Sequence, residues 1–247
     1  MPILGLATYG GVDLQFTAAD IAAIRFTVLQ AILSAALSVA LAISASRALA
    51  RQNFKGREVL ISILSAPFIL PVIVAISGVL FIFGREGVFN QFLGSLGQET
   101  VSIYGLSGIL LVHVFFNLPL AIRILLFGWG AIPIEHHRVA RGLKLNAWTR
   151  FKIIELPMLV SRVPAATAII FVICLSSFAV ALLLGGGPRA TTVELAIYQA
   201  FRFDFDIAKA GQLALVQTCF AAVAIIISFA VMKRLDVGIG YLPTEPM

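Results

Sequence analysis

The chain has 247 residues, of which 60% are hydrophobic and 12% are charged, and its net charge is +6. Soluble domains usually contain about 25% charged residues, so this composition excludes an ordinary soluble protein and predicts an all-α polytopic membrane protein. Because the cations flank apolar runs instead of forming one basic face, the positive charge predicts membrane anchoring and no nucleic-acid partner.

Residues 1–20 are predicted to form an external N-terminal segment, because they are too polar and too often interrupted to span a bilayer. The first membrane span is expected from Ile21 to Ser46, with Asp20 as the N-cap of its helix. This span is rich in alanine and serine, which favour close contact between helices over exposure to lipid.

The second span is expected from Val59 to Phe83. It contains Pro67 and Pro71, which predict a kink or a local break in the helix. Residues 84–104 form a loop of mixed charge, whose centre is a candidate for a short interfacial helix.

The third span is expected from Gly105 to Trp129 and is polar for a membrane helix. His113 and Asn117 lie four residues apart and therefore share a helix face. Such groups at membrane depth usually face a cavity or a partner. The two residues are candidates for lining a translocation path, and hydrogen bonding between helices is the alternative.

The segment from Ile132 to Leu159 is the one long polar and basic stretch of the sequence. Its apolar residues recur at three- and four-residue spacings, which predicts one apolar helix face, and Leu156-Pro157 is expected to end that helix. Asn146 suits the N-cap of a second helix within the segment. Such a segment either docks on a soluble protein or lies on the membrane surface. Its apolar residues are Leu143, Leu145, Trp148, Phe151 and Ile154.

The fourth span is expected from Val163 to Leu184. A glycine-rich turn at residues 185–188 and a short amphipathic helix follow it. The fifth span is expected from Ala208 to Met232, so that residues 21–232 form the transmembrane domain and residues 233–247 a tail.

The basic residues predict the orientation of these five spans. Of the 18 Lys and Arg residues, 13 fall on one side: after the first span, around the segment 132–159, and after the fifth span. Cytoplasmic loops contain the excess of Lys and Arg in membrane proteins. We therefore expect the N-terminus outside, and both the segment 132–159 and the C-terminus in the cytoplasm.

Part of this segment resembles a motif of ABC importer membrane subunits, E-A-A-x3-G-x9-I-x-L-P, which lies in a cytoplasmic loop between two spans. Residues 154–157, Ile-Glu-Leu-Pro, match its end. The glycine of the motif falls on Lys144 and its E-A-A on residues 138–140, so that only Ala140 agrees there, and Gly142 lies two residues from the expected glycine. The end of the motif is present and its head is degenerate.

The flanking stretches HVFFNLPLAIRILL and LGGGPRATTVELAIYQAFRFDFDIAKAGQLALVQ are similar to the N-terminal half of thiamine importer permeases, and the similarity runs from Ile24 to Met232. Iron(III), molybdate and polyamine permeases share the general layout and are the alternative substrate classes. The chain is roughly half as long as a fused permease and lacks the span that usually precedes Ile21. A fragment, a split gene product and a dimerising subunit all fit this length.

The resemblance implies a type I importer permease of the bacterial inner membrane, which is not itself an enzyme. A cytoplasmic ATPase would bind the coupling segment, a second permease half would complete the path, and an external binding protein would deliver substrate. The chain contains no G-x-x-x-x-G-K-[ST] sequence, in agreement with ATP hydrolysis by a separate protein. No cofactor or metal is expected. The implied coupling residues are Arg138, Ala140, Gly142, Lys144, Trp148, Phe151, Ile154, Leu156 and Pro157.

Two other classes of function are alternatives: a secondary transporter or channel, and a membrane-embedded enzyme. The spans contain few carboxylates for proton coupling and no convergent set of catalytic side chains.

Cys174 and Cys219 lie in apolar runs and are expected to be buried. Arg202, Asp204 and Asp206 either touch an external binding protein or form a solvated face, and we favour the solvated face.

Overall fold

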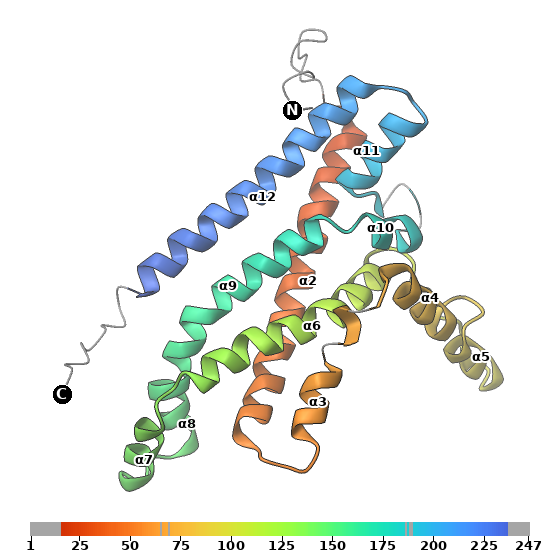
Figure 1. Cartoon of the computed structure of the whole chain (residues 1–247). Helices are drawn as coiled ribbons and strands as arrows, with labels where there is room; N and C mark the ends of the chain where they lie inside the picture. Colours follow the sequence, from red (N-terminus) through yellow and green to blue (C-terminus); the bar gives the residue numbers. More distant parts are fainter. Residues whose placement is uncertain (1–15, 65, 69, 186, 188–189, 237–247) are drawn as a thin grey trace.

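The computed structural model describes residues 16–236 except 65, 69, 186, 188 and 189, and every regular element in this part of the chain is helical (Figure 1). The longest helices are α2, with 34 residues, and α12, with 30. The elements in chain order are α2 (Ala18–Arg51), α3 (Arg57–Ile63), the short 3-10 helix η1 (Ala66–Phe68), α4 (Val72–Phe83), α5 (Val88–Ser95), α6 (Leu106–Gly130), α7 (Ile134–Gly142), α8 (Ala147–Arg150), the π-helical turn η2 (Phe151–Glu155), α9 (Leu156–Leu175), α10 (Phe178–Leu184), α11 (Val193–Arg202) and α12 (Ile207–Asp236).

Five segments of the described chain are long and apolar enough to cross a membrane, as the composition predicts. One of them, Val72–Ser95, includes both α4 and α5 and the turn between them. The others are Ala18–Arg51, Leu106–Gly130, Ala147–Leu175 and Ile207–Ala230.

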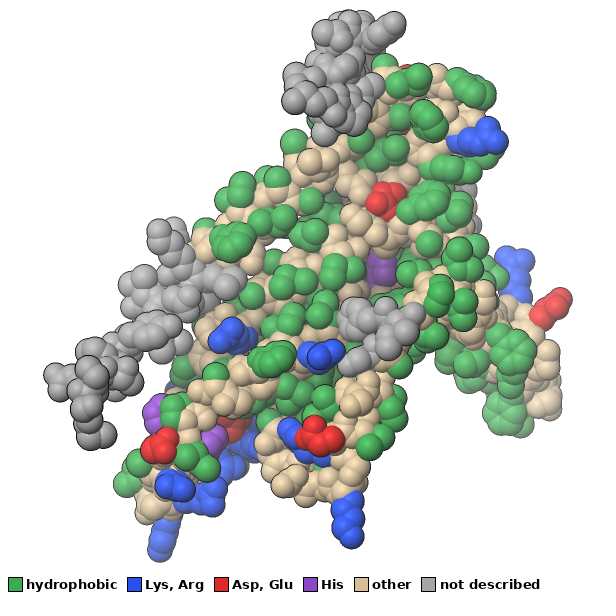
Figure 2. Space-filling model, viewed as in Figure 1, with side chains coloured by type: hydrophobic (Ala, Val, Ile, Leu, Met, Phe, Trp, Pro, Cys, Tyr) green, Lys and Arg blue, Asp and Glu red, His purple; other side chains and the backbone are tan. Residues whose placement is uncertain are grey.

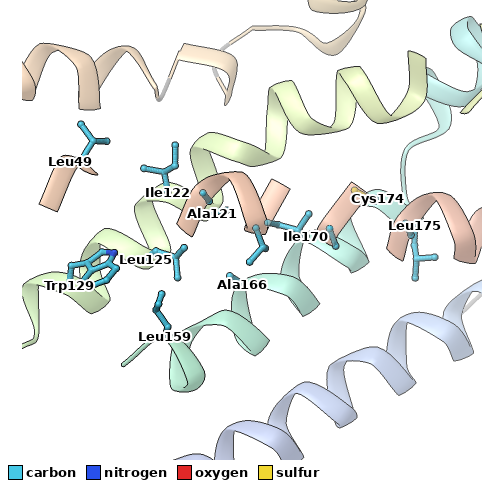
Figure 3. Packing of buried hydrophobic residues seen from close by; sticks show 14 residues of the cluster. Leu49, Ala121, Ile122, Leu125, Trp129, Leu159, Ala166, Ile170, Cys174 and Leu175 are labelled. Carbon is cyan, nitrogen blue, oxygen red and sulfur yellow. The ribbon is translucent and has the colours of Figure 1, made fainter. Parts of the chain in front are cut away.

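Helix α2 is the centre of the bundle, with α6 and α9 packed against it (Figure 1). Ala31, Ala35 and Ala42 on α2 are almost completely buried, as the small-residue composition of this span predicts. Larger side chains from α6 and α9 fill the space beside them, and Figure 3 shows Leu125, Trp129 and Ile170 among these. The close packing fixes the three helices relative to one another.

Helices α10 and α11 lie at the end of the bundle away from α7 and α8, and α12 runs from there along α9 (Figure 1). At the start of α12, Lys209 Nζ lies 3.1 Å from Asp20 Oδ1 on α2. The backbone N–H of Val193 on α11 donates to Thr27 Oγ1 on α2 at 2.8 Å. These contacts hold the α11–α12 unit on the central helix.

The start of α2 differs from the sequence-based expectation. Its N-cap is Thr17, and Asp20 occupies the third helical position, where the two side chains form a reciprocal capping box. The helix also continues to Arg51, five residues past the expected end at Ser46. Arg51 occupies the last turn, where a cation is favourable.

The predicted break in the second span is confirmed, but the bounds differ from those expected, since the apolar segment of the described chain that can cross a membrane is Val72–Ser95. The chain forms α3, η1 and α4 in place of one helix over Val59–Phe83. Proline cannot donate a backbone hydrogen bond, and Pro67 lies in η1 while Pro71 is the N-cap of α4. The short helix predicted within residues 84–104 is present as α5.

The expected fourth span also ends too late. Helix α9 stops at Leu175, and Ser176-Ser177 separates it from α10, which ends at Leu184.

Burial of the two cysteines is confirmed for Cys174 and wrong for Cys219, which is exposed. Little of the surface of α12 is buried, because within the described chain this helix packs mainly on α9 and α11. The glycine-rich turn lies partly outside the described residues, and the tail from residue 237 onward lies wholly outside them.

Candidate functional site

The segment between α6 and α9 forms a helical hairpin that projects from one end of the bundle (Figure 1). Helix α7 is the first arm, and α8 with η2 is the second. In Figure 2 the Lys and Arg side chains gather at this end, over the hairpin and the neighbouring end of α2 and α3. The hairpin, defined as residues 132–155, is therefore a basic, exposed unit attached to two long helices.

The turn between the two arms has a left-handed residue at its centre. After α7 the backbone N–H of Lys144 bonds to Arg141 O at 3.0 Å, and that of Leu145 bonds to Ala140 O at 3.0 Å. This pair of bonds is the Schellman pattern, which places the residue after the C-cap in the left-handed region. Lys144 occupies that place with a φ of 50°. Counted along the sequence, the glycine of the motif falls on Lys144, and glycine is the residue that adopts this conformation without steric cost.

The second arm begins where the sequence predicts and continues further than predicted. Asn146 is the N-cap of α8, and its Oδ1 accepts a bond from Thr149 N at 2.7 Å, which confirms the predicted cap. The chain then stays helical through Pro157 to Leu175, so the expected helix end at Leu156-Pro157 is wrong. The π-helical turn η2 precedes the proline, which lies in the first turn of α9, where a missing N–H is tolerated.

Glu155 links the second arm to the central helix α2 through two ion pairs. Its side chain is 1% exposed, and its Oε2 accepts a hydrogen bond from Arg47 Nε at 2.7 Å. Its Oε1 is paired with Arg51 Nη2. A carboxylate buried between two arginines is held by charge-assisted bonds from both sides. The hairpin therefore has an ionic attachment to α2.

Sequence reasoning missed this attachment. Glu155 appeared only as the variable residue of the I-x-L-P match, and Arg47 and Arg51 only as membrane-flanking cations. One signal was available: Glu155 is the single acid between Glu135 and Glu194, in a strongly basic stretch. An isolated carboxylate there indicates a nearby basic partner.

Two aromatic residues extend this attachment to the surface. The Arg47 guanidinium lies over the Phe151 ring at 4.8 Å from its centroid, so that Arg47 contacts both Phe151 and Glu155. The Phe151 ring stacks on Trp148 with centroids 5.7 Å apart. Trp148 is 71% exposed. A large rigid side chain that is exposed on one side and stacked on the other is typical of an interface anchor.

The nine residues implied as a coupling site do not share one environment. Ala140 is buried and packs inside the hairpin, and Phe151 and Ile154 are half-buried. The expected single apolar face is also wrong, because Leu143 and Leu145 lie in the turn between the arms. The exposed members are Arg138, Gly142, Lys144, Trp148, Leu156 and Pro157.

The two candidate path residues lie between helices in this chain. Nδ1 of His113 is 2.9 Å from Ser34 Oγ on α2, and Asn117 Nδ2 donates to Cys174 Sγ on α9 at 3.2 Å. Both side chains are almost fully buried. These are the interhelical hydrogen bonds that were the alternative interpretation, and the path-lining role stays a prediction.

Arg202, Asp204 and Asp206 are all exposed, in agreement with the favoured interpretation as a solvated face. Asp206 also has a structural role, because its Oδ1 accepts the backbone N–H of Lys209 at the start of α12 at 2.9 Å.

Comparison with protein families matches residues 38–240 to the family described as "Binding-protein-dependent transport system inner membrane component". The chain is 46% identical over 216 residues to the thiamine transport system permease protein ThiP of Escherichia coli (strain K12), and the match covers 87% of the chain and 40% of that protein. It is 42% identical over 205 residues to ThiP of Brucella abortus (strain 2308), with 82% and 38% covered. The match lies in the N-terminal half of these relatives, and the chain spans about 40% of their length.

Solved structures with a similar fold include a bacterial ABC transporter involved in the import of the acidic polysaccharide alginate. Its TM-score is 0.78 at 17% identity, with 97% of this chain and 90% of that chain covered. A second structure is the alginate transporter in complex with its alginate pentasaccharide-bound periplasmic protein, with a TM-score of 0.76, 18% identity, and 93% and 85% covered. At these identities the similarity is one of fold.

Proposed function

This chain belongs to the family of binding-protein-dependent transport system inner membrane components, and we propose that it is one permease half of an ABC importer for thiamine. In this proposal a separate cytoplasmic ATPase supplies the energy, a second permease half completes the path, and an external binding protein delivers the substrate. Residues 21–232 are the permease domain, and residues 132–159 are its coupling segment.

The observation that supports this function best is the attachment of the hairpin to the central helix. A docking element transmits force only if it is rigid and fixed to the part that moves. The hairpin is helical in both arms, and Glu155 joins it to α2 through Arg47 and Arg51. Since α2 packs on both α6 and α9, a displacement of the hairpin acts on three membrane helices together.

The surface of the hairpin fits a soluble protein partner better than it fits the membrane plane. The exposed Trp148 is stacked on the Phe151 ring, and the hairpin also has exposed cations, among them Lys144 and Lys152. Aromatic anchors with a polar rim are common at protein interfaces. A helix lying on the membrane would instead have a continuous apolar stripe, and the turn at Leu143–Leu145 interrupts any such stripe.

The orientation that we propose puts the hairpin in the cytoplasm. The ends of α2 and α3, the loop between them and the whole hairpin contain nine of the 18 Lys and Arg residues and lie at the same end of the bundle (Figure 2). Cytoplasmic segments contain the excess of such residues. The N-terminus is then external and the C-terminus cytoplasmic.

The substrate assignment is supported by the relatives. Thiamine permeases of Escherichia coli, Salmonella typhimurium and Brucella match this chain at 41–46% identity over at least 205 residues. Iron(III), molybdate and polyamine importers remain the alternative substrate classes, and transport assays with each cargo separate them.

Replacement of Trp148 by alanine tests the docking role. We expect Trp148→Ala to reduce co-purification with the ATPase and to lower both ATP-dependent thiamine uptake and ATPase activity in the assembled transporter. Phe92→Ala on α5 is the matched control, because Phe92 is also a large exposed aromatic residue but lies away from the hairpin. If ATPase association and uptake both survive in Trp148→Ala and Phe151→Ala, the hairpin is not the docking element. Uptake that needs no ATPase would support a secondary transporter or channel.

A further inference from the structure

A pocket of about 610 Å³ lies at the end of the bundle opposite the hairpin. It is bounded by the C-terminal end of α9, by α10 and α11, and by the middle of α12. Neither the hairpin nor the coupling mechanism uses it. Its chemically distinctive lining residues are Ser176, Phe178, Glu194, Tyr198, Phe201 and Gln217.

A single carboxylate without a cationic partner supplies the charge of this pocket. Glu194 Oε1 accepts a hydrogen bond from Gln217 Nε2 at 3.1 Å, and its Oε2 is buried without a hydrogen-bond partner. No Lys or Arg of the described chain forms an ion pair with it, and none lines the pocket. Burial raises the pKa of Glu194, and hydrogen bonds from the Gln217 side chain and the Phe178 backbone oppose that shift. A buried carboxylate oxygen without a partner is a place for a positive ligand.

The end of α9 adds negative potential on the same side. The Nε2 of Gln217 also donates to Leu175 O at 3.0 Å, and Gln30 Nε2 on α2 donates to Cys174 O at 2.9 Å. These amides satisfy two of the free carbonyls at the helix C-terminus. The C-terminus of a 20-residue helix has a partial negative charge, and its C-cap, Ser176, lines the pocket.

Aromatic rings form the remaining wall. Phe178 on α10 and Tyr198 on α11 have ring centroids 5.2 Å apart at an angle of 56°, and Phe201 lies one helical turn beyond Tyr198. Ring faces attract organic cations and also pack against flat apolar groups. A hard divalent ion would instead require about six or more oxygen ligands, usually with several carboxylates, whereas the only carboxylate of the described chain that lines this pocket is Glu194.

We propose that this pocket binds a monovalent organic cation that contains an aromatic ring, with Glu194 pairing the charge and Tyr198 and Phe178 stacking on the ring. The proposal deepens the proposed function and rests on it, since a thiazolium-containing substrate such as thiamine has this chemistry. In the proposed orientation the pocket opens on the external half of the permease, where a substrate would leave its binding protein.

Equilibrium binding of radiolabelled thiamine and of tetramethylammonium to the complete transporter in lipid nanodiscs, without binding protein, tests this site. We expect Glu194→Gln and Tyr198→Leu each to weaken thiamine binding by about tenfold or more, and Tyr198→Phe to retain it. Asp204→Asn is the matched control, since it removes one exposed carboxylate outside the pocket lining. The uncharged aminopyrimidine part of thiamine should bind the wild type and Glu194→Gln equally. ATPase activity of each variant confirms that it is folded and assembled.

The outcomes separate this site from the proposed function. Unchanged thiamine affinity in both Glu194→Gln and Tyr198→Leu, in a transporter that imports thiamine, would overturn the site and leave the proposed function standing. Tetramethylammonium binding that depends on Glu194, in a transporter that does not take up thiamine, would support the cation site and overturn the thiamine assignment. Binding of neither cation by the assembled wild type would overturn the site.

Discussion

Arg47 and Glu155 join the central helix to the hairpin, with Nε and Oε2 2.7 Å apart, although they lie 108 positions apart in the sequence. Arg51 shares the same carboxylate. Loss of the charge would leave two arginines facing each other without an anion. This contact is an ionic connection between the hairpin and α2.

Replacement of Glu155 by glutamine should therefore destabilise the protein by roughly 3 kcal/mol, because a buried charge pair loses one partner. Thermal unfolding in detergent measures the effect, and uptake should fall even in the variants that remain folded. The control is Glu58→Gln, whose carboxylate pairs with Arg57 but is 82% exposed, so that its loss should change stability by less than about 1 kcal/mol. Equal effects of the two substitutions would contradict the anchoring role.

Lys144→Gly should stabilise the hairpin by about 1 kcal/mol, because Lys144 has a φ of 50° and glycine adopts this conformation without steric cost. The neighbouring substitution Leu143→Gly is the control: Leu143 has a φ of −78°, so glycine there should only add flexibility and lower stability. The thermal midpoints of the two variants should move in opposite directions. A decrease for Lys144→Gly would show that its side chain contributes more than its backbone strain.

Asn146→Ala should lower stability by about 1 kcal/mol, because the N-cap bond to Thr149 N is lost. Asn146→Asp retains an acceptor at the same position and should keep most of the stability. Limited proteolysis of the hairpin reports the local effect, with faster cleavage expected for alanine alone. Equal cleavage of all three proteins would mean that α8 does not depend on its cap.

Ser34→Ala should cost about 1 kcal/mol, since it leaves the Nδ1 of buried His113 without a partner. Ser62→Ala is the control, because Ser62 is exposed and bonds only to Glu58 O within its own helix.

If His113 and Asn117 also line the path, conservative variants of them should change the KM of uptake more than they change the thermal midpoint.

The apolar helices could be predicted because each depends on local composition and length. The expected fifth span, from Ala208 to Met232, falls within α12, and the third, from Gly105 to Trp129, agrees with α6 within one residue at each end. Asn146 was predictable for the same reason, since a cap is decided by its near neighbours.

Features that depend on tertiary packing or on helix register could not be predicted. The partner of Glu155 follows from the side of α2 that meets η2, which no local pattern specifies. Pro157 was expected to end a helix because proline usually does so, and the π-helical turn that precedes it here cannot be recognised from residue types. The pocket around Glu194 needs α9, α10, α11 and α12 together, although Glu194 and Gln217 each looked ordinary in sequence.

The π-helical turn η2 has one further consequence, which concerns rotation. Each residue of an α-helix turns the chain by about 100°, whereas the wider turn of η2 uses one more residue for nearly the same rotation and so sets the angle between the face of α8 and the face of α9. The direction in which Trp148 points is thus determined by a count of residues as well as by contacts. If the same residues formed a regular α-helix, that tryptophan would be rotated by about a quarter turn relative to the membrane helix, whereas deletion of the exposed Ile153 would leave its direction almost unchanged.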